Sequence, residues 1–314
     1  MDFKPCYTWP NPAFPFRLYF NHEHCRIFII ENISHNWNWL YQFRDRIRPT
    51  DYFFVQLGWY FDDWLALESK RAIDALELDA SRFVIMYADY ASKQTFEGLG
   101  FRGCIVNHNC FLDYNQFTSH DEAKEYDAIY VARFSPGKRH YLCDHLCNLA
   151  LVAGNAWGVE AKTIPPHSFK NELPLTPNQV IEKINQSKCG LALSEFEGAC
   201  YSSSEYLLCG IPVVSTWSHG GRDIWYNSYN SIICDADPSK VAQAVTSLIS
   251  RKRDPSKIRD MHIRLSEQMR DSFKEYVSQI IRQHNVSIDI DRYFEDNYFH
   301  KMIKSQRPDF SQLF

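Results

Sequence analysis

Short apolar runs that alternate with helical patterns are the feature that most limits how this 314-residue chain can fold. The first such runs are CRIFII (25–30), YFFVQL (52–57), RFVIMY (82–87) and GCIV (103–106). Between the second and third runs, Leu65, Ile73 and Leu76 have helix-compatible spacings. Alternation of this kind is typical of βαβ units with a mostly parallel sheet. We therefore predict a small α/β domain over residues 1–118.

A second series of apolar runs predicts another α/β domain over residues 119–265. Its runs are YDAIYVARF (126–134), LALVAG (149–154), CGLALS (189–194), IPVVST (211–216) and SIIC (231–234). Thr176-Pro177 with Gln179 is a capping box with proline at the first helical position, and Asp237-Pro238 likewise begins a helix. Residues 266–314 are predicted to be mainly helical.

Composition and charge exclude several classes of protein. Apolar residues make up 45% and charged residues 23% of the chain, which is typical of a globular protein. The net charge of −4 argues against nucleic acid as a partner, because such binding needs a basic surface. No run of about 18 apolar residues occurs, and residues 1–15 lack a basic segment followed by an unbroken apolar run, so we predict neither a spanning helix nor secretion.

The compartment is predicted from the cysteines. Ten cysteines lie scattered in apolar strings, as expected of reduced core residues in the cytoplasm. The basic run at 251–257 is interpreted as a solvated helix end, and a peripheral contact with the inner face of a membrane is the alternative.

Residues 189–221 carry the most chemical information. They read as a buried strand, a loop, a short helix that stops at Gly210, and a second buried strand. Ligands of open α/β sheets lie beyond the carboxyl ends of the strands, where this loop is expected, and a helix N-terminus favours a phosphate. Glu197 and Glu205 could accept hydrogen bonds from the hydroxyls of a sugar and a ribose. Small residues let a ligand approach the backbone; they include Gly198, Ala199, Ser203 and Ser204.

A diphosphate also needs cations, which another loop supplies. VARFSPGKRH places Arg133 and Lys138 after the first strand of the second domain. Pro136-Gly137 is a turn signal that would bring the two side chains toward one point.

Several ordered motifs resemble one known family. Glu197-x7-Glu205 resembles the E-x7-E segment of retaining GT-B glycosyltransferases, specifically glycosyltransferase family 4 (group 1) and its relatives. VARFSPGK resembles their Arg/Lys phosphate-binding loop, and IVNHNCFLDYNQF (105–117) resembles their "NGVD…F" stretch. HGGRDIWYNSYNSIIC resembles their "GG…E…NG" stretch, so that the likeness covers about residues 103–250.

The resemblance implies a GT-B fold of two Rossmann-like domains whose mostly parallel sheets face each other across a cleft. A shortened N-terminal domain would take the acceptor, and the C-terminal helices would cross back to it. Glu197 would contact the donor sugar, Glu205 the ribose, and Arg133 with Lys138 would stabilise the departing diphosphate. The remaining residues implied to bind the donor are Gly198, Ala199, Cys200, Tyr201, Ser203 and Ser204. No metal and no separate cofactor is expected.

The predicted function is transfer of a sugar, with retention, from a nucleoside-diphosphate sugar to a saccharide, a lipid-linked saccharide or a related acceptor. One alternative is a non-catalytic GT-B protein that binds a nucleotide-sugar or serves as a subunit of a larger transferase. A nucleotide-sugar epimerase is a second alternative. The nucleotide base, the sugar, the acceptor and the oligomeric state are not legible in the sequence.

Some candidate residues also have structural interpretations. Ser202-x-x-Glu205 fits a capping box. The group His140, Cys143, Asp144, His145 and Cys147 suggests a metal site, but a helix whose cysteines face the core is favoured. Aromatic residues could stack on an acceptor sugar or, as favoured, pack in the core or at a domain interface; they are Trp37, Trp39, Tyr41, Trp59, Tyr60 and Trp64. His35, Gly58 and Asp89 flank first-domain strands and could border the cleft.

Overall fold

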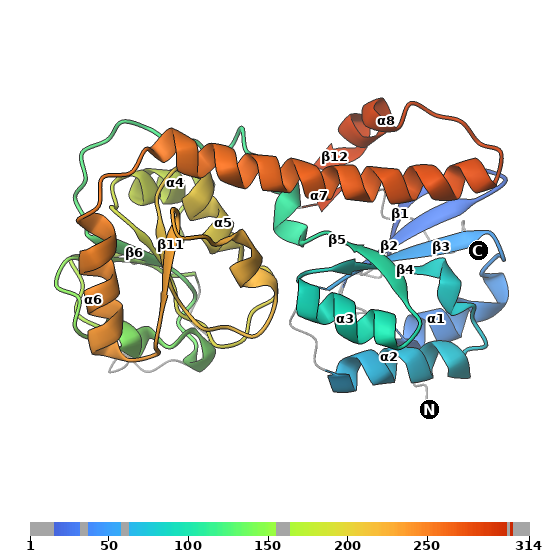
Figure 1. Ribbon diagram of the computed structural model, residues 1–314, viewed down its shortest axis with the longest axis horizontal. Helices are drawn as coiled ribbons and strands as arrows, with labels where there is room; N and C mark the ends of the chain where they lie inside the picture. The colour runs from blue at the N-terminus through green and yellow to red at the C-terminus, as the bar shows by residue number, and fades with distance from the viewer. Residues whose placement is uncertain (1–15, 32–36, 58–62, 155–163, 300–301, 304–314) are drawn as a thin grey trace. The chain divides into compact units, whose positions relative to one another are not determined.

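The chain folds into two compact α/β units in the computed structural model, which describes residues 16–31, 37–57, 63–154, 164–299 and 302–303 (Figure 1). Unit 1 comprises residues 1–112 and 267–314, and unit 2 comprises residues 113–266. Each unit contains a mostly parallel sheet, which confirms the predicted fold class.

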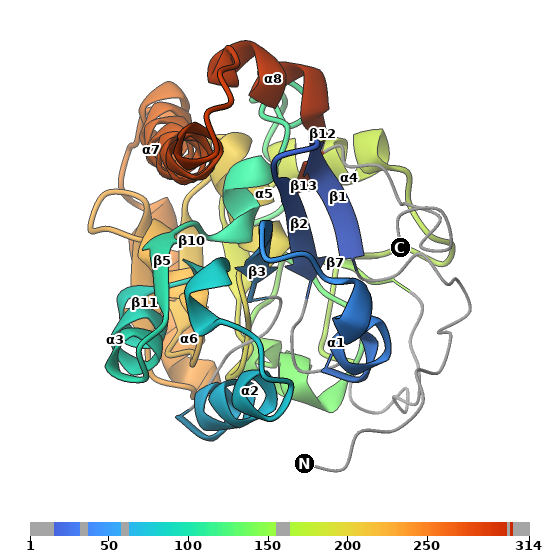
Figure 2. The same ribbon diagram turned by 90° about the vertical axis from the view of Figure 1, so that its right-hand side faces the viewer.

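Unit 1 is built on a five-stranded sheet whose spatial order follows the sequence. Its strands are β1 (Phe16–Asn21), β2 (Arg26–Glu31), β3 (Asp51–Gln56), β4 (Phe83–Tyr87) and β5 (Arg102–Ile105). β1 runs antiparallel along β2 at the edge of the sheet (Figure 2), and the other neighbours are parallel. Because strands β2 to β4 are almost wholly apolar, they are buried between layers of helices.

The helices of unit 1 cover both faces of this sheet. One face carries α1 (Trp37–Phe43), α2 (Asp63–Ala75) and α3 (Tyr90–Gly98), as Figure 1 shows. The other face carries the later part of α7 (Pro255–Gln283), whose Phe273 ring packs edge-on against Tyr19 and Phe54. The short helix α8 (Ile290–Asn297) and the hairpin of β12 (Tyr298–Phe299) and β13 (Met302–Ile303) complete the unit.

Unit 2 has a parallel sheet of six strands in the order β11-β10-β9-β6-β7-β8. The strands are β6 (Ala128–Val131), β7 (Leu149–Val152), β8 (Phe169–Lys170), β9 (Gly190–Ala192), β10 (Val213–Thr216) and β11 (Ser231–Cys234). The chain builds outward from β6 to β8, then returns to pair β9 with the other side of β6. This is the doubly wound Rossmann order, and the reversal between β6 and β9 is its topological switch point.

Local sequence signals explain the helices of unit 2. α4 (Pro177–Asn185) begins with the predicted capping box of Thr176 and Gln179, and α6 (Pro238–Ile249) begins at Asp237, whose carboxylate accepts from two backbone N–H groups. α5 (Tyr201–Leu208) is short because Gly210 turns the chain at φ 75°. A Cβ added at Gly210 would lie 2.8 Å from Pro255, so the turn also needs glycine for space.

α7 contributes residues to both units and is anchored in each by an arginine. In unit 2, Arg259 donates to the carbonyl oxygens of Tyr114, Phe117 and Leu208. In unit 1, Arg270 donates to the carbonyl oxygen of Cys110 at 2.7 Å.

The structure corrects the prediction of a helix over residues 140–147. Residues 140–147 do not form a helix with both cysteines facing the core: a 3₁₀ turn covers His140–Cys143, and the chain then bends. Cys143 is buried whereas Cys147 is exposed, because a 3₁₀ turn that ends at residue 143 cannot place residue 147 on the same face.

Candidate functional site

The switch point of unit 2 brings together two residues that lie far apart in the sequence. Lys138 follows β6, and Glu197 follows the neighbouring strand β9. The Lys138 ammonium donates to Oε1 of Glu197, and the same oxygen accepts from Ser194 Oγ at 2.7 Å. Glu197 is only 4% exposed, so the pair forms a partly desolvated charge site at the carboxyl ends of the strands.

Arg139 fixes the loop that carries Lys138. Its backbone adopts a left-handed conformation with φ 51°, which closes the turn that begins at Pro136. Its guanidinium donates to the Leu193 carbonyl and to Thr216 Oγ1, each at 2.7 Å, and lies 3.7 Å from a carboxylate oxygen of Glu195. Arg139 therefore ties together the ends of three strands. Sequence reasoning missed it, although it directly follows Lys138 in the same basic turn.

Arg133 is not held at the Lys138–Glu197 pair. Its side chain is exposed and forms no hydrogen bond or ion pair with any residue in the part of the chain that the structure describes. Its predicted phosphate role stays a prediction.

The helix that follows the Glu197 loop begins without a side-chain cap. Cys200 occupies the N-cap position of α5 at φ 56°, and no side-chain cap hydrogen bond forms. The capping-box interpretation of Ser202 and Glu205 is wrong, because α5 starts at Tyr201 and places Glu205 fifth in the helix. Glu205 is 7% exposed.

The other predicted donor-binding residues lie around this helix start. Gly198 and Ala199 are buried in the loop, Cys200 and Tyr201 are half-buried, and Ser203 and Ser204 are fully buried. Ser203 Oγ pairs with the Tyr226 hydroxyl at 2.6 Å, and burial raises the pKa of Tyr226 well above its ordinary value.

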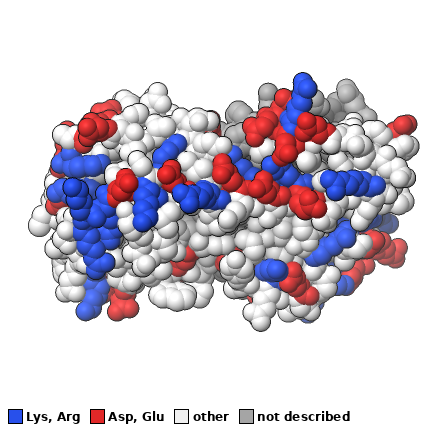
Figure 3. All heavy atoms as spheres, turned by 45° about the horizontal axis from the view of Figure 1, so that its top comes forward, with Lys and Arg blue, Asp and Glu red and all other residues white. Residues whose placement is uncertain are grey.

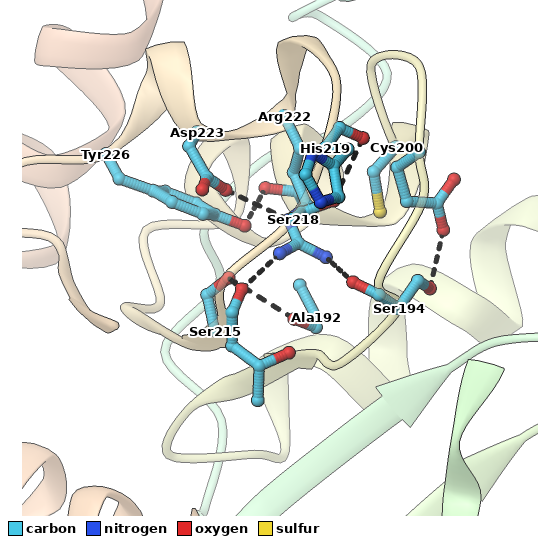
Figure 4. A network of polar contacts seen from close by, with 12 residues as sticks. Ala192, Ser194, Cys200, Ser215, Ser218, His219, Arg222, Asp223 and Tyr226 are labelled. Carbon is cyan, nitrogen blue, oxygen red and sulfur yellow. Dashed lines mark hydrogen bonds and ion pairs between the residues drawn. The ribbon is translucent and has the colours of Figure 1, made fainter. Parts of the chain in front are cut away.

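A fully buried guanidinium, that of Arg222, organises the loops on the other side of β9 (Figure 4). It donates to the Ser194 carbonyl at 3.0 Å and to the Thr216 carbonyl at 2.5 Å. Its Nε lies 3.2 Å from the Asp223 carboxylate. Since Ser194 also donates to Glu197, Arg222 is linked through one residue to the charged pair. Sequence reasoning missed Arg222; its place after Gly220-Gly221, beyond a buried strand, was the available signal.

His140 belongs to the core of unit 2. Its ring lies 4.8 Å from that of Tyr130 and 4.6 Å from that of Phe134, measured between centroids. Burial lowers the pKa of His140 to about 4, against a hydrogen bond to Ala132 that raises it. Among the residues that the structure describes, no group of three His, Cys, Asp or Glu side chains could hold a metal ion.

The first-domain candidates have mixed outcomes. Trp37 is buried in the core, whereas Tyr41 and Trp64 are exposed. Asp89 caps α3 and so has a structural partner. His35, Gly58, Trp59, Tyr60 and the side chain of Trp39 lie outside the described residues.

Basic side chains gather on one face of unit 2, whereas both signs mix on unit 1 (Figure 3). Part of the basic run at 251–257 has structural contacts. Arg253 donates to the carbonyls of Tyr229 and Leu248, and the Lys257 ammonium lies 4.4 Å from the centre of the Tyr229 ring.

None of the helices among the described residues combines the length and the apolar composition that a membrane span requires.

Comparison with solved structures identifies the class of fold. No protein-family model matches the chain, and no curated protein matches it. Many solved structures do match, and they share the fold of the GT-B glycosyltransferases. The predicted GT-B fold is thereby confirmed.

Three of these structures show the extent of the likeness. Anabaena Alr3699/HepE, in complex with UDP, is 13% identical at a TM-score of 0.59, over 80% of this chain and 78% of its own. Sucrose-phosphate synthase from Thermosynechococcus elongatus is 13% identical at 0.59, over 82% and 73%. Trehalose 6-phosphate synthase from Burkholderia multivorans is 10% identical at 0.58, over 83% and 72%.

Proposed function

We propose that this chain is a glycosyltransferase that takes its sugar from a nucleoside-diphosphate sugar bound in unit 2. The proposal rests on one observation: Lys138 and Glu197 form an ion pair at the switch point of a Rossmann sheet. Ligands of doubly wound sheets bind at this point, outside the carboxyl ends of the strands. The GT-B fold and the UDP bound to HepE support a uridine nucleotide as the first donor to test.

The charged pair suggests how a donor would be held. Lys138 and Glu197 form an ion pair with each other. An arriving diphosphate would offer Lys138 phosphate oxygens in place of the carboxylate, and the N-terminus of α5, which carries about half a positive elementary charge, would add to the attraction. Glu197 would then be released to accept hydrogen bonds from the hydroxyls of the donor sugar. Glu205, from α5, is proposed to contact the ribose.

The same arrangement would assist the chemical step. As the glycosidic bond to the diphosphate breaks, negative charge grows on the leaving group, and preorganised cations lower the barrier most where charge develops. Lys138 supplies such a cation, with Arg133 proposed as a second. We propose that transfer proceeds with retention and without a metal ion, to a saccharide or lipid-linked saccharide acceptor.

Donor titration tests the proposal directly. Calorimetry with UDP-, GDP-, ADP- and CMP-sugars is expected to show binding of one nucleotide class, and adding acceptor extracts is expected to consume that donor. Absence of binding to every nucleotide would sink the proposal. Binding without consumption would indicate a non-catalytic subunit, and conversion of the free donor without any acceptor would indicate an epimerase.

A matched pair of variants tests the role of Lys138. Lys138→Ala is expected to lower kcat by about 10²- to 10³-fold, because one cation at the leaving group is lost. Lys188→Ala is the control: Lys188 pairs with Asp127 at 2.6 Å just before the same two strands, at their amino ends. The control should retain the full rate. Equal rates in the two variants would contradict the phosphate role of Lys138.

A further inference from the structure

The loops that follow β9 and β10 carry an exposed aromatic surface, formed by Glu195, Phe196, Trp217 and His219, which we call the aromatic rim. Trp217 is 76% exposed, although Thr216 before it is fully buried and Ser218 after it is 6% exposed. Among the described residues, no ring stacks on Trp217. A large indole left in solvent by an otherwise buried segment is unusual and points to a ligand.

The two loops of the rim are fixed to each other. Backbone bonds join Glu197 N to the His219 carbonyl at 3.0 Å and His219 N to the Glu195 carbonyl at 2.7 Å. The rings of Phe196 and His219 stack at 5.2 Å with planes 17° apart. Figure 4 shows His219 beside Cys200 and Arg222, in the network that reaches Ser194. The rim is therefore a preorganised surface attached directly to the loop of Glu197.

The place of the rim in the sheet indicates which end of a donor it would meet. This step rests on the proposed function. A donor with its diphosphate at the β6–β9 switch point and its sugar at Glu197 would have the sugar on the β9 side of that point, because Glu197 follows β9 and β10 is the next strand. Trp217 follows β10, so it lies on the sugar side. Glu197 is buried whereas Trp217 is exposed, so the indole is available to a second ring outside the one that Glu197 holds.

We propose that the aromatic rim binds an uncharged pyranose ring of the acceptor saccharide, with Trp217 as the stacking platform. One face of a pyranose ring presents C–H groups and is apolar, whereas its edge carries hydroxyls. Trp217 and Phe196 offer apolar faces. The carboxylate of Glu195, with a side chain 53% exposed, can accept from ring hydroxyls while Arg139 offsets its charge. This combination fits a neutral sugar better than an anionic one.

Saturation-transfer NMR on the full chain tests the proposal, with and without saturating UDP. The probes are tetrasaccharides of glucose, galactose, mannose and N-acetylglucosamine. At least one probe is expected to bind, and Trp217→Ala is expected to weaken its binding about tenfold. Trp217→Phe keeps an aromatic face and should recover most of the affinity. Tyr90→Ala removes another aromatic side chain that is 72% exposed, at the start of α3 in unit 1, and should have no effect.

Measuring nucleotide binding by the same variants distinguishes a failure of this inference from a failure of the proposed function. Trp217→Ala is expected to bind UDP and UDP-glucose as the wild type does. If the wild type binds UDP but no tetrasaccharide, or if Tyr90→Ala weakens saccharide binding as much, the inference is overturned and the donor site stands. If Trp217→Ala loses affinity for UDP-glucose but not for UDP, the platform holds the donor sugar, which also overturns it. Failure of the wild type to bind any nucleotide overturns the proposed function instead.

Discussion

Two helices, α3 in unit 1 and α5 in unit 2, follow parallel strands in the same way but begin differently. At α3, the Asp89 carboxylate accepts from Ser92 N at 2.7 Å, and the Ser92 hydroxyl pairs with Asp89 N at 3.3 Å. At α5, Cys200 provides no side-chain cap. The start of α5 therefore lacks the side-chain cap that α3 has. This difference agrees with the proposal that the donor diphosphate binds at α5.

The two units also differ in how completely their cations are paired within the protein. In unit 1, Arg26 binds Asp51 through two bonds of 2.7 and 2.6 Å at the amino ends of β2 and β3, and both are almost fully buried. Three cations at the carboxyl edge of unit 2 each touch one carboxylate: Lys138 touches Glu197, Arg139 touches Glu195, and Arg222 touches Asp223. The fork of Arg26 is satisfied within the fold, whereas the single contact of the Lys138 ammonium with Glu197 can be exchanged for a phosphate at lower cost.

The largest effect on stability is expected for the Arg26–Asp51 pair of unit 1. Arg26→Met leaves the Asp51 carboxylate buried without its charge partner and should lower the free energy of unfolding by about 3–5 kcal/mol. The double variant Arg26→Met/Asp51→Leu removes both charges and should recover much of that loss. Urea denaturation followed by circular dichroism measures both. A loss under 1 kcal/mol in the single variant would show that this pair is not structural.

The pH dependence of stability is a property in which the units should behave alike. Burial lowers the pKa of His108 in unit 1 and of His140 in unit 2 to about 4 each. The pKa of a histidine in the unfolded chain is about 6.5, so the unfolded chain binds more protons than the folded chain between pH 6.5 and pH 4. The stability that neutral His140 provides is present above pH 6.5 and is lost as the pH falls toward 4.

His140→Phe isolates the contribution of unit 2 to this dependence. Between pH 7 and pH 4.5, His140 alone should lower the free energy of unfolding of the wild type by about 2–3 kcal/mol. The fall in the free energy of unfolding of the variant should be smaller by this amount. Urea midpoints across this range measure the difference. Parallel pH profiles for the two proteins would refute the assignment to His140.

Arg222→Lys tests whether the carboxyl edge depends on a fork-shaped cation. Lysine cannot donate to the Ser194 and Thr216 carbonyls with the geometry of guanidinium, so the Glu197 loop should loosen. Donor affinity should fall by about 2 kcal/mol, roughly thirtyfold in Kd. Arg253→Lys is the control, since Arg253 also donates to backbone carbonyls but at the junction of α6 and α7. Calorimetry that shows equal donor affinity in both variants would exclude a positioning role for Arg222.

The sequence predicted the fold further than it predicted the site. Strands such as β3 and β4 are continuous apolar runs, so the hydrophobic pattern predicts them. β1 and β8 lie at the edges of their sheets, and β8 has only two residues, too few for a recognisable pattern. Lys138 and Glu197 were predictable because each follows a buried strand. Their direct contact was not, since it depends on β6 pairing with β9. The main partners of Arg139 and Arg222 are backbone carbonyls, whose positions depend on the fold. Only the place of each arginine, in a basic turn and after Gly220-Gly221, was visible in the sequence.

Cys200→Gly sharpens the contrast between α3 and α5 with the smallest expected effect. Cys200 has φ 56° and ψ 84°, a left-handed conformation that costs an L-residue about 1–2 kcal/mol and glycine almost nothing. Glycine also loses about 0.5–1 kcal/mol of chain entropy on folding, so the net gain in stability should be about 0.5 kcal/mol. Cys200→Ala removes the sulfur but keeps the strain, and it should give no gain. If alanine stabilises the protein as much as glycine does, the sulfur rather than the backbone is the unfavourable element. If only glycine does, the chain tolerates a strained, uncapped helix start at the place where we propose that the donor diphosphate binds.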